Sequence, residues 1–439
     1  MASDVHRKSY RPADIAFWTI VTTGLSCASS ATLAQAEWEI AVGIGSEYSD
    51  NAAKSQTDTL SERRDSAELR LNLDYTNQLL AAEANYQATE TRYDKGSQED
   101  RSVVEGSSQL QLGQPRHPVD LLVTHSRRRV LNAPDAVDLL ANNDEREILT
   151  AAPGFRWRAS DVDLLALRGH YSTIEYRFSP ELESERTGGN VFWSRRLSET
   201  DQIDVTAQTM DVAFEALPTL DYRFDAYDIG YEVSLRRLQY RLQLGYNETT
   251  PEVGDRLSSP SFLVEGLYTS GLHSWQLNAQ RFITDSSSGS GNRGDLSEFL
   301  PGDATTGEID QIERTESELE WSTEAFCQRC DASVALYTRS DDYRQVDEDG
   351  SASGARLNMR YELSRRSSAS LTWSLRDQSF ESDVAREDFT DQQTRLTYQR
   401  RFQNDLEWSA TVLYIDRDSE DPSRRYNETV GGMRIGYVF

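Results

Sequence analysis

This chain consists mostly of short runs in which apolar and polar residues alternate. In residues 69–75, for example, leucine or tyrosine occupies every odd position and a charged or amide side chain every even position. A repeat of two is that of a β-strand with one apolar and one wet face. Counting such runs gives about twenty strands, in a range of about 18–22. The expected strands lie near residues 37–49, 64–76, 79–93, 101–113, 118–130, 144–158, 162–178, 185–197, 201–214, 220–235, 238–249, 258–269, 272–284, 310–323, 331–341, 352–363, 368–379, 388–401, 405–417 and 426–439.

The links between these strands alternate between short and long along the whole chain. Links such as 77–78 and 236–237 are short, whereas links such as 50–63 and 285–309 are long and polar. A transmembrane barrel has short periplasmic turns, longer outer loops and an even number of strands. A soluble propeller or sandwich has no reason to sort its loops in this way. We therefore predict one all-β domain, a transmembrane antiparallel up-and-down β-barrel with both termini on the periplasmic side.

The composition agrees with this fold. Hydrophobic residues make up 37% of the 439 residues, which is low for a protein with a large apolar core. The same fraction is expected if each strand offers lipid only every second residue. A disordered chain could also be this polar, but it would be poor in aromatic residues. The chain has 8 Trp, 20 Tyr and 14 Phe, so we exclude disorder.

The first 36 residues have the pattern of an export signal. A basic start at residues 6–11 precedes an apolar run at residues 15–25, and Ala34-Gln35-Ala36 fits the small-x-small rule for cleavage. The apolar run is too short to span a bilayer comfortably as a helix. We expect a cleaved signal peptide at residues 1–36 and a mature outer-membrane barrel at residues 37–439.

The three cysteines allow several interpretations. Cys27 raises the alternative of a lipoprotein, but Gly24 occupies the position where a lipobox has leucine. Cys327 and Cys330 lie in an expected periplasmic turn, where their spacing is compatible with a redox pair, half a metal site or a local disulfide. The sequence has no second cysteine pair and no histidine beside this one. In an oxidising periplasm we therefore expect a disulfide that closes the turn.

Charged residues of both signs recur on the polar faces of the strands. An arginine facing lipid would cost about 2–4 kcal/mol near the midplane, whereas one facing a watery lumen costs little. Two interpretations remain open: a solvated wall with cross-strand ion pairs, or a selective conduit whose charges contact a polar solute. Mixed signs suit a polyhydroxylated solute held at several points. The candidate lumen-lining residues are Glu68, Arg70, Asp74, Arg168, Arg241, Arg356, Arg360, Arg376, Arg395 and Arg434, with Glu83, Glu232, Glu265, Glu318 and Glu320 on the same faces.

A run of three arginines, Arg127, Arg128 and Arg129, lies toward the outer end of the fifth expected strand. If they point outward they would be placed to bind lipopolysaccharide phosphates, since guanidinium groups pair with phosphate in a bidentate manner. If they point inward they would ring the mouth of the barrel. A third interpretation is a rim cluster that balances nearby acidic loops.

The longest expected loop, residues 285–309, is rich in glycine and serine. Leu296, Phe299 and Leu300 would anchor this loop if it folded inward as a constriction. Its acidic side chains do not have the spacing of a defined calcium loop, so we expect no metal site. The mature histidines belong to no recognisable nucleophile motif, so we expect neither enzyme activity nor a cofactor. These acidic residues are Asp285, Asp295, Glu298 and Asp303, and the histidines are His117, His125, His170 and His273.

Three short segments carry a resemblance to a known family. They are Ser46-Glu-Tyr-Ser-Asp-Asn51, Trp193-Ser-Arg-Arg-Leu-Ser-Glu-Thr-Asp201 and Arg281-Phe-Ile-Thr-Asp-Ser-Ser287. With them, nearly the whole mature chain resembles the β-barrel porins that include outer-membrane proteins encoded with exopolysaccharide and exosortase systems. The resemblance implies the outer membrane of a Gram-negative bacterium and a role in polysaccharide export. It implies no catalytic residue.

The last strand also resembles a feature of outer-membrane barrels. Met433, Ile435, Tyr437 and Phe439 alternate with small or charged residues, and they resemble the terminal signal read by the barrel-assembly machinery. An ordinary amphipathic edge strand is the alternative for this segment alone.

From these features we expect a conduit for a polar solute, with polysaccharide export as the specific role. A general diffusion porin and a non-transporting surface or adhesion barrel are the alternatives. The expected partners are outer-membrane lipid and lipopolysaccharide, the barrel-assembly machinery and polysaccharide-export components. Nucleic acid is not expected, because the chain carries a net charge of −27 and has no basic patch.

Overall fold

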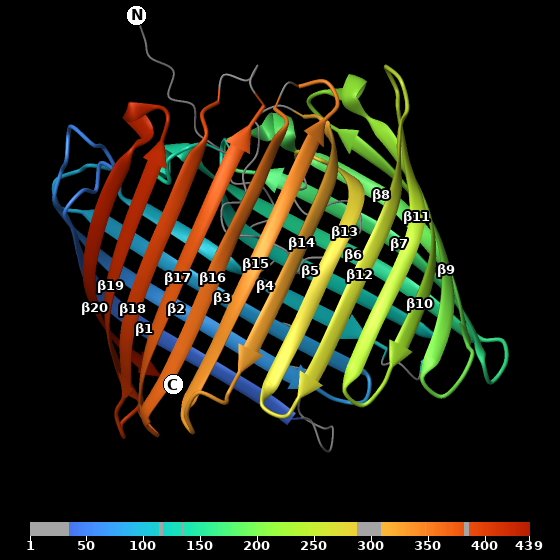
Figure 1. Ribbon diagram of the computed structural model, residues 1–439, viewed down its shortest axis with the longest axis horizontal. Helices are drawn as coiled ribbons and strands as arrows, with labels where there is room; N and C mark the ends of the chain where they lie inside the picture. Colours follow the sequence, from blue (N-terminus) through green and yellow to red (C-terminus); the bar gives the residue numbers. More distant parts are fainter. Residues whose placement is uncertain (1–34, 114–116, 134, 288–308, 347, 382–385) are drawn as a thin grey trace, which may run out of the picture.

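The computed structural model is a closed antiparallel β-barrel of twenty strands (Figure 1). It describes residues 35–439 except 114–116, 134, 288–308, 347 and 382–385. The strands are β1 Gln35–Ser49, β2 Glu62–Thr76, β3 Leu80–Tyr93, β4 Arg101–Leu112, β5 Val119–Leu131, β6 Asn143–Arg158, β7 Asp163–Tyr176, β8 Ser184–Arg196, β9 Asp201–Phe214, β10 Tyr222–Ser234, β11 Leu238–Pro251, β12 Leu257–Ser270, β13 His273–Asp285, β14 Gln311–Thr323, β15 Cys330–Tyr343, β16 Gly350–Ser364, β17 Ser367–Phe380, β18 Phe389–Arg401, β19 Leu406–Ser419 and β20 Tyr426–Val438.

The ring closes between the first and last strands. β1 pairs with β2 on one side and with β20 on the other, and the register with β20 runs from Ala41↔Val438 to Ser49↔Val430. Every other strand pairs with its two neighbours in sequence. The predicted fold class and strand number are therefore confirmed. β1 begins two residues before the predicted cleavage point, and residues 1–34 of the predicted signal peptide lie outside the described residues.

The links fall into two length classes at opposite ends of the barrel. Those at the end that holds the start of β1 and the end of β20 are short, such as the link at residues 77–79. Those at the other end are longer on the whole, and we call that end the mouth. Four short 3-10 turns lie in mouth links: η1 Leu140–Asn142, η2 Pro180–Leu182, η3 Pro218–Leu220 and η4 Pro422–Arg424. Among the described residues, no helix has the length and apolar character needed to cross a bilayer.

The outer face of the barrel is apolar. Large aliphatic side chains such as Leu69, Leu244 and Leu396 are about half or more exposed on it, and such residues recur on most strands. Aromatic residues lie near the short-link end, where the rings of Trp275 and Trp321 are 5.9 Å apart. An exposed apolar belt with an aromatic girdle is what a lipid-facing barrel requires. A closed barrel also leaves no unpaired strand edge in the hydrocarbon. The protein therefore resides in the Gram-negative outer membrane, and by the rule for such barrels the longer links are expected on its outer side.

Two hairpins separate from the wall at the mouth. β4 and β5 pair only from Gly106↔Arg127 down to Leu112↔Leu121, although β4 stays paired with β3 up to Arg101. β12 and β13 pair only up to Phe262↔Arg281, although β13 stays paired with β14 up to Asp285↔Gln311. Beyond these points, toward the mouth, β5 is no longer paired with β4 and β13 is no longer paired with β12. The mouth ends of the β5–β6 hairpin and of β13 turn inward from there.

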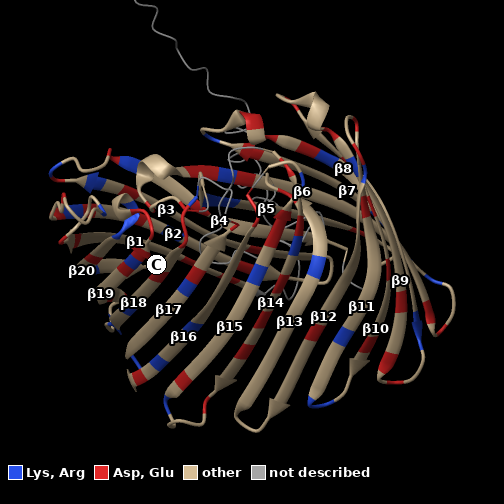
Figure 2. Cartoon of the chain, turned by 45° about the horizontal axis from the view of Figure 1, so that its top comes forward, with Lys and Arg blue, Asp and Glu red and all other residues tan. Residues whose placement is uncertain are grey.

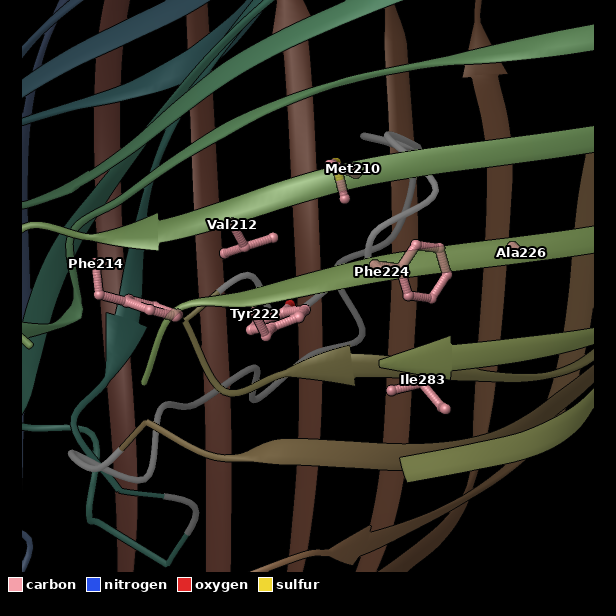
Figure 3. Packing of buried hydrophobic residues seen from close by; sticks show 7 residues of the cluster. All are labelled: Met210, Val212, Phe214, Tyr222, Phe224, Ala226 and Ile283. Carbon is pink, nitrogen blue, oxygen red and sulfur yellow. The ribbon is translucent and has the colours of Figure 1, made fainter. Parts of the chain in front are cut away.

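Two clusters of buried apolar residues lie where these hairpins meet the inner wall. One cluster consists of Met210, Val212 and Phe214 on β9, Tyr222, Phe224 and Ala226 on β10, and Ile283 on β13 (Figure 3). A second cluster consists of Val130, Ile148, Ile174, Tyr176 and Leu182. Ile309 packs against both clusters. The hydrophobic core of this barrel is therefore at the mouth and not along the whole lumen.

Candidate functional site: the lumen and its mouth

The ten predicted lumen-lining residues lie on the strand faces opposite to the apolar belt. On β2, Glu68 and Arg70 flank Leu69, which is 48% exposed on the outer face. On β18, Arg395 precedes the outward Leu396, and on β20 Arg434 lies between Met433 and Ile435. Because successive side chains of a strand point to opposite faces, the charged residues face the lumen. The same alternation places Asp74, Arg168, Arg241, Arg356, Arg360 and Arg376 there.

Three of these side chains, together with Glu407 of β19, meet across the closure of the ring. Arg70 Nε lies 3.1 Å from Glu68, and Arg70 Nη2 lies 3.4 Å from Glu407 on β19. Arg434 on β20 forms a second ion pair with Glu68, at 2.5 Å. This network joins β2, β19 and β20 across the face of β1. Gly43 on β1 makes room for it, because a Cβ there would lie 2.9 Å from Arg434 Nε.

The alternation of the strands divides the inward charges unevenly around the circumference of the lumen, and Figure 2 marks where charged residues of both signs lie along the strands. On β9–β14 seven carboxylates face inward together with two arginines, Arg241 and Arg314. These carboxylates are Asp204, Asp228, Glu232, Glu265, Glu316, Glu318 and Glu320. On the flanking strands arginine predominates among the inward charges. On β15–β18 the arginines are Arg339, Arg356, Arg360, Arg376, Arg395 and Arg401, against Asp331, Asp341, Glu362 and Asp391; on β6–β8 they are Arg146, Arg156, Arg158, Arg168, Arg186 and Arg196, against Asp144.

Ion pairs join the acidic arc and the wall around it. Arg241 lies 3.5 Å from Asp204 on β9, and Arg356 on β16 lies 3.8 Å from Glu318 on β14. Arg168 lies 3.6 Å from the buried Asp120 of β5, which also pairs with Arg156. These contacts hold the side chains along the wall, and a polar solute in the lumen would meet both signs of charge within one cross-section.

A recess of about 540 Å³ lies in the lumen beside the closure of the ring. Besides the Glu68–Arg434 network, the charged residues Glu47, Arg64 and Arg129 and several hydroxyl and amide side chains line it. Two of the hydroxyl groups, those of Thr397 and Thr411, are 3.2 Å apart. Groups of this kind donate and accept hydrogen bonds without a net charge. The hydroxyl and amide residues of this lining are Ser66, Gln87, Thr89, Thr91, Thr397, Gln399, Ser409 and Thr411.

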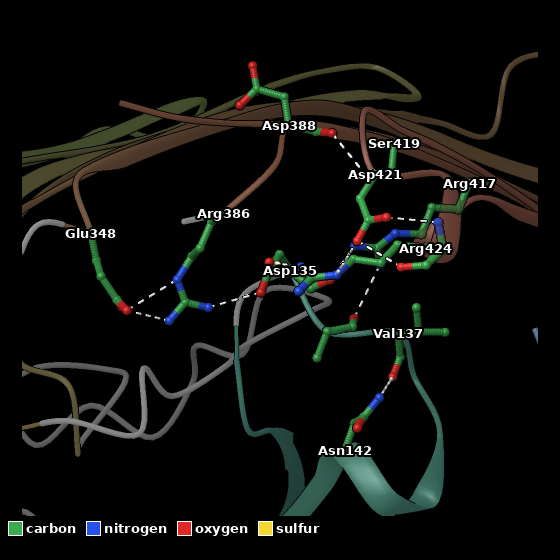
Figure 4. Close-up of polar contacts among 12 residues, drawn as sticks. Asp135, Val137, Asn142, Glu348, Arg386, Asp388, Arg417, Ser419, Asp421 and Arg424 are labelled. Carbon is green, nitrogen blue, oxygen red and sulfur yellow. Dashed lines mark hydrogen bonds and ion pairs between the residues drawn. The ribbon is translucent and has the colours of Figure 1, made fainter. Parts of the chain in front are cut away.

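The β5–β6 hairpin carries residues 135–142, which we call the mouth segment, across the mouth to the side of β18–β20. Asp135 is 2% exposed and forms ion pairs with Arg386, at 2.9 Å, and with Arg424 of η4. Arg417 of β19 donates to the main-chain carbonyl of Asp135 at 2.6 Å and to that of Ala136 at 3.2 Å. We call these four residues the Asp135 clasp (Figure 4). The clasp ties a hairpin from one side of the barrel to β19 and the loops beside it.

A lysine holds the other part of the mouth segment. Lys54, in the β1–β2 link, is 9% exposed, donates to the Asp138 carbonyl and lies 3.8 Å from the Asp138 carboxylate. The surrounding wall desolvates the Asp138 carboxyl and so acts to raise its pKa. Lys54 and the Asn143 amide outweigh this effect and hold the pKa of Asp138 below its ordinary value. The carboxylate is thus charged at any pH near neutrality, and the Lys54 contact is available there.

The inward end of β13 is anchored by a buried ion pair. Arg186 on β8 donates to both carboxylate oxygens of Asp285, at 2.9 and 2.8 Å, and to Ser287 Oγ at 3.0 Å. Tyr222 on β10 donates to the same carboxylate at 2.5 Å, and Tyr176 on β7 donates to the Ser287 carbonyl at 2.6 Å. The first residues of the longest loop are therefore fixed against β7, β8 and β10.

The returning end of this loop is fixed as well. The carboxylate of Asp310 accepts hydrogen bonds from the main-chain amides of Gln345 and Val346, at 2.6 and 2.9 Å. Gln311 accepts from Thr249 and from Arg344. Both described ends of the loop thus lie inside the mouth. Leu296, Phe299 and Leu300, the predicted anchors, lie outside the described residues, as do Asp295, Glu298 and Asp303.

The three consecutive arginines of β5 are held within the inward hairpin. Arg127 pairs with Glu145 at 2.8 Å and with Glu147 at 3.7 Å. Arg129 pairs with Glu105 of β4 at 3.3 Å. Arg128 lies on the opposite face of β5 from these two. Arg127 and Arg129 therefore balance nearby carboxylates, which corresponds to the third of the three interpretations of this run.

The remaining predicted positions are accounted for as follows. A disulfide joins Cys327 and Cys330 in the turn between β14 and β15, while Cys27 lies outside the described residues. His125 contacts the Tyr86 hydroxyl at 2.5 Å and Glu147 at 2.9 Å, and the Ser108 hydroxyl is bonded to Tyr86. Within the described ranges, no group of three or more His, Cys, Asp or Glu side chains is arranged to hold a metal ion.

The residues that close the mouth were not among the sequence candidates. Arg186 and Arg417 could have been found, because both lie on the inward face of their strands. Arg186 is near the start of β8 and Arg417 near the end of β19, each next to a long link. Asp135 and Arg386 lie in polar links without periodicity, and nothing local marks them as partners. Their contact joins positions 251 residues apart in sequence.

Comparison with known proteins assigns neither a family nor a function to this chain. No family model matches the sequence, and no curated protein matches it significantly. Among solved structures, the siderophore receptor PirA from Pseudomonas aeruginosa matches at 11% identity and a TM-score of 0.44, over 93% of this chain and 81% of that one. The FrpB iron transporter from Neisseria meningitidis matches at 9% and 0.49, over 91% and 81%. OccK2 (OpdF) from Pseudomonas aeruginosa matches at 8% and 0.41, over 92% and 98%. All three are β-barrels, and no functional residue is transferred from them.

Proposed function

We propose that the protein is a conduit that carries polar solutes across the outer membrane. The observation that carries this proposal is the lumen wall, which is lined by charged and hydroxyl side chains whose signs are divided into acidic and basic arcs. A barrel whose only task was to present loops would need no such lining. Burying many charges inside a barrel is favourable when water and solute fill the lumen, since unhydrated charges are expensive.

The solute class that we favour is a carbohydrate, in the setting of polysaccharide export. The supporting observation is the recess beside the ring closure, where eight hydroxyl and amide side chains lie next to the Glu68–Arg70–Arg434 network. Such a surface offers many neutral hydrogen bonds with a few charge-assisted ones. This suits a chain of sugar hydroxyls, to which a purely ionic wall would bind poorly. A general diffusion porin is the second candidate, and it has the same lumen without selective binding in the recess.

One experiment separates these candidates. The purified protein is inserted into planar lipid bilayers, and the current is recorded with and without neutral oligosaccharides. The proposal predicts steady conductance that oligosaccharides block, and it predicts weaker block in Thr397→Val/Thr411→Val. Conductance without any saccharide block would favour a diffusion porin. A folded, inserted barrel without conductance would favour a surface or adhesion role.

The proposal includes the partners expected for such a barrel. Met433, Ile435 and Tyr437 are exposed on the lipid-facing side of β20, and Phe439 lies beside Tyr437 with the ring centres 4.8 Å apart. We propose that this stripe is the segment recognised by the barrel-assembly machinery. Lipopolysaccharide would surround the outward end, and export components would meet the short-link end. An in vivo crosslink from a photoreactive group at Met433 tests the first of these contacts.

A further inference from the structure

The Asp135 clasp has the composition of a carboxylate-binding site. Arg386 and Arg424 approach the two oxygens of the Asp135 carboxylate from separate links, and Arg417 holds the main-chain carbonyl behind it. Guanidinium groups bind carboxylates strongly because their donors match the two oxygens. Asp135 and Arg417 are almost fully buried, so this is a built site rather than an exposed ion pair. The protein fills it with a carboxylate of its own.

Each of the three arginines also has a carboxylate partner outside the clasp. Arg386 also pairs with Glu348, whereas Arg417 lies 3.7 Å from Asp391 and Arg424 lies 3.4 Å from Asp421. These second contacts hold the guanidinium groups in position from outside the clasp. The guanidinium nitrogens that face Asp135 would still lose their acceptor if Asp135 left, and a partly buried guanidinium without its partner is costly. Any replacement for Asp135 must therefore bring a carboxylate or a similar anion.

The group that fills the site belongs to a hairpin that is braced internally. The Asn142 amide donates to the Val137 carbonyl at 2.8 Å, and the Asn143 amide donates to Asp138 at 2.9 Å and to the Leu139 carbonyl at 2.8 Å. The mouth segment thus behaves as one body. If Asp135 left the clasp, residues 135 and 136 would together lose their contacts with β19 and the links beside it.

We propose that Arg386, Arg417 and Arg424 form a carboxylate-binding site at the mouth, which Asp135 occupies in the resting protein and which a carboxylate-bearing solute takes in its place. Displacement frees the mouth segment from the β19 side and widens the entrance. The inference rests on the proposed conduit function and describes how a solute would regulate the opening of the conduit. It also narrows the class of solute, because an acidic sugar carries the carboxylate that must replace Asp135 and a neutral sugar does not.

The tether sets the concentration at which a solute competes. A group on a short linker has an effective concentration on the order of millimolar at its site. The mouth segment is braced and held at Lys54, so it presents Asp135 at a higher effective concentration than a flexible linker would, and a free carboxylate should compete only in the upper millimolar range, at about 100 mM or more. Lys54 still holds Asp138, so the segment remains attached at its other end and closes again when the solute leaves.

The test uses the full protein in planar bilayers, with glucuronate as the probe and glucose as its uncharged counterpart, each titrated from about 10 mM to about 500 mM at constant ionic strength. Glucuronate should raise the conductance of the wild type, and glucose should not. Asp135→Asn should show the raised conductance without any probe and should not respond to glucuronate. Arg425→Gln is the matched control, because Arg425 neighbours Arg424 but contacts only the Ser419 carbonyl and Asp418. It should behave as the wild type.

A second measurement does not depend on conductance or on a mutated clasp. A nitroxide label at Val137→Cys reports the motion of the mouth segment in the otherwise intact protein. Glucuronate should increase its mobility in the upper millimolar range, and glucose should leave it unchanged. Conductance without any effect of glucuronate or of Asp135→Asn would overturn the carboxylate site while leaving the conduit intact. Increased mobility in a barrel that never conducts would support the site and overturn the conduit.

Discussion

The guanidinium of Arg186 on β8 and the carboxylate of Asp285 at the end of β13 form a two-point hydrogen-bonded ion pair inside the barrel. Their exposures are 3% and 0%, and the pair joins strands that are not neighbours in the ring. It fixes the inward end of β13 where the wall between β12 and β13 opens. Together with the Asp135 clasp, it determines the shape of the mouth.

Arg186→Gln should destabilise the mouth strongly. Removing one partner of a buried ion pair leaves the other charge uncompensated, which typically costs about 3–5 kcal/mol. Equilibrium urea unfolding in lipid vesicles measures the loss, and channel recordings should show increased current noise as β13 loosens. Arg223→Gln is the control, because the exposed Arg223–Asp225 pair should contribute no more than about 1 kcal/mol. Equal losses in the two variants would contradict this account.

Gly106→Val should disturb the point at which β4 and β5 separate. Gly106 has a φ of 153°, and a Cβ there would lie 2.2 Å from the Asn85 carbonyl oxygen and 2.7 Å from the Tyr86 ring. Neither backbone nor packed ring can yield cheaply, so we expect a loss of about 1–3 kcal/mol. Gly431→Val, where a Cβ meets nothing within 4 Å, should have little effect on the urea midpoint.

The two sides of the lumen should affect ion selectivity in opposite directions. Glu318→Gln removes a charge from the acidic arc and should move the reversal potential in a salt gradient toward anion preference. Arg356→Gln, at its ion-pair partner, should move it toward cation preference. One unit charge acting on an ion about 4 Å away in water is worth about 1 kcal/mol, so the local ion concentration changes by up to about fivefold. Shifts of the same sign would show that these residues do not line the conducting path.

The lipid-facing side can be tested with neighbouring residues of one strand. Leu396→Arg places a charge on the outer face of β18, where it should cost up to about 2–4 kcal/mol near the midplane. Gln399→Arg places the same charge in the lumen beside the recess and should be nearly neutral. The comparison uses the fraction of heat-modifiable folded barrel in outer-membrane preparations. A large loss with Gln399→Arg alone would reverse the assignment of the two faces.

Strand alternation predicts the barrel well where the ring is fully paired. β2 and β18 are paired with neighbours along their whole length, so the residues opposite Leu69 and Leu396 face the lumen as expected. Glu145 shows where this reasoning fails. It has the outward parity of β6, yet it is 3% exposed and pairs with Arg101, Arg127 and Arg177. The alternation of a strand tells which residues share a face, but not whether the strand stays in the wall.

The inward turn of the hairpins depends on contacts between distant parts of the chain. Asp135 and Asp285 lie in or beside polar links whose composition is that of ordinary outer loops. Their partners lie on distant strands and links, and only the closed ring brings those partners close enough to form ion pairs with the two aspartates. The loop lengths could therefore predict which end is the mouth, but not that two links fold into it.

The most direct test of the central claim is the current through single molecules of the wild-type protein in a planar bilayer. The account predicts discrete conductance steps that increase with salt concentration and that change when Glu318 or Arg356 is neutralised. Bilayers that remain silent after insertion of heat-modifiable, folded barrel would contradict it, because a lumen of this lining would then carry no ions.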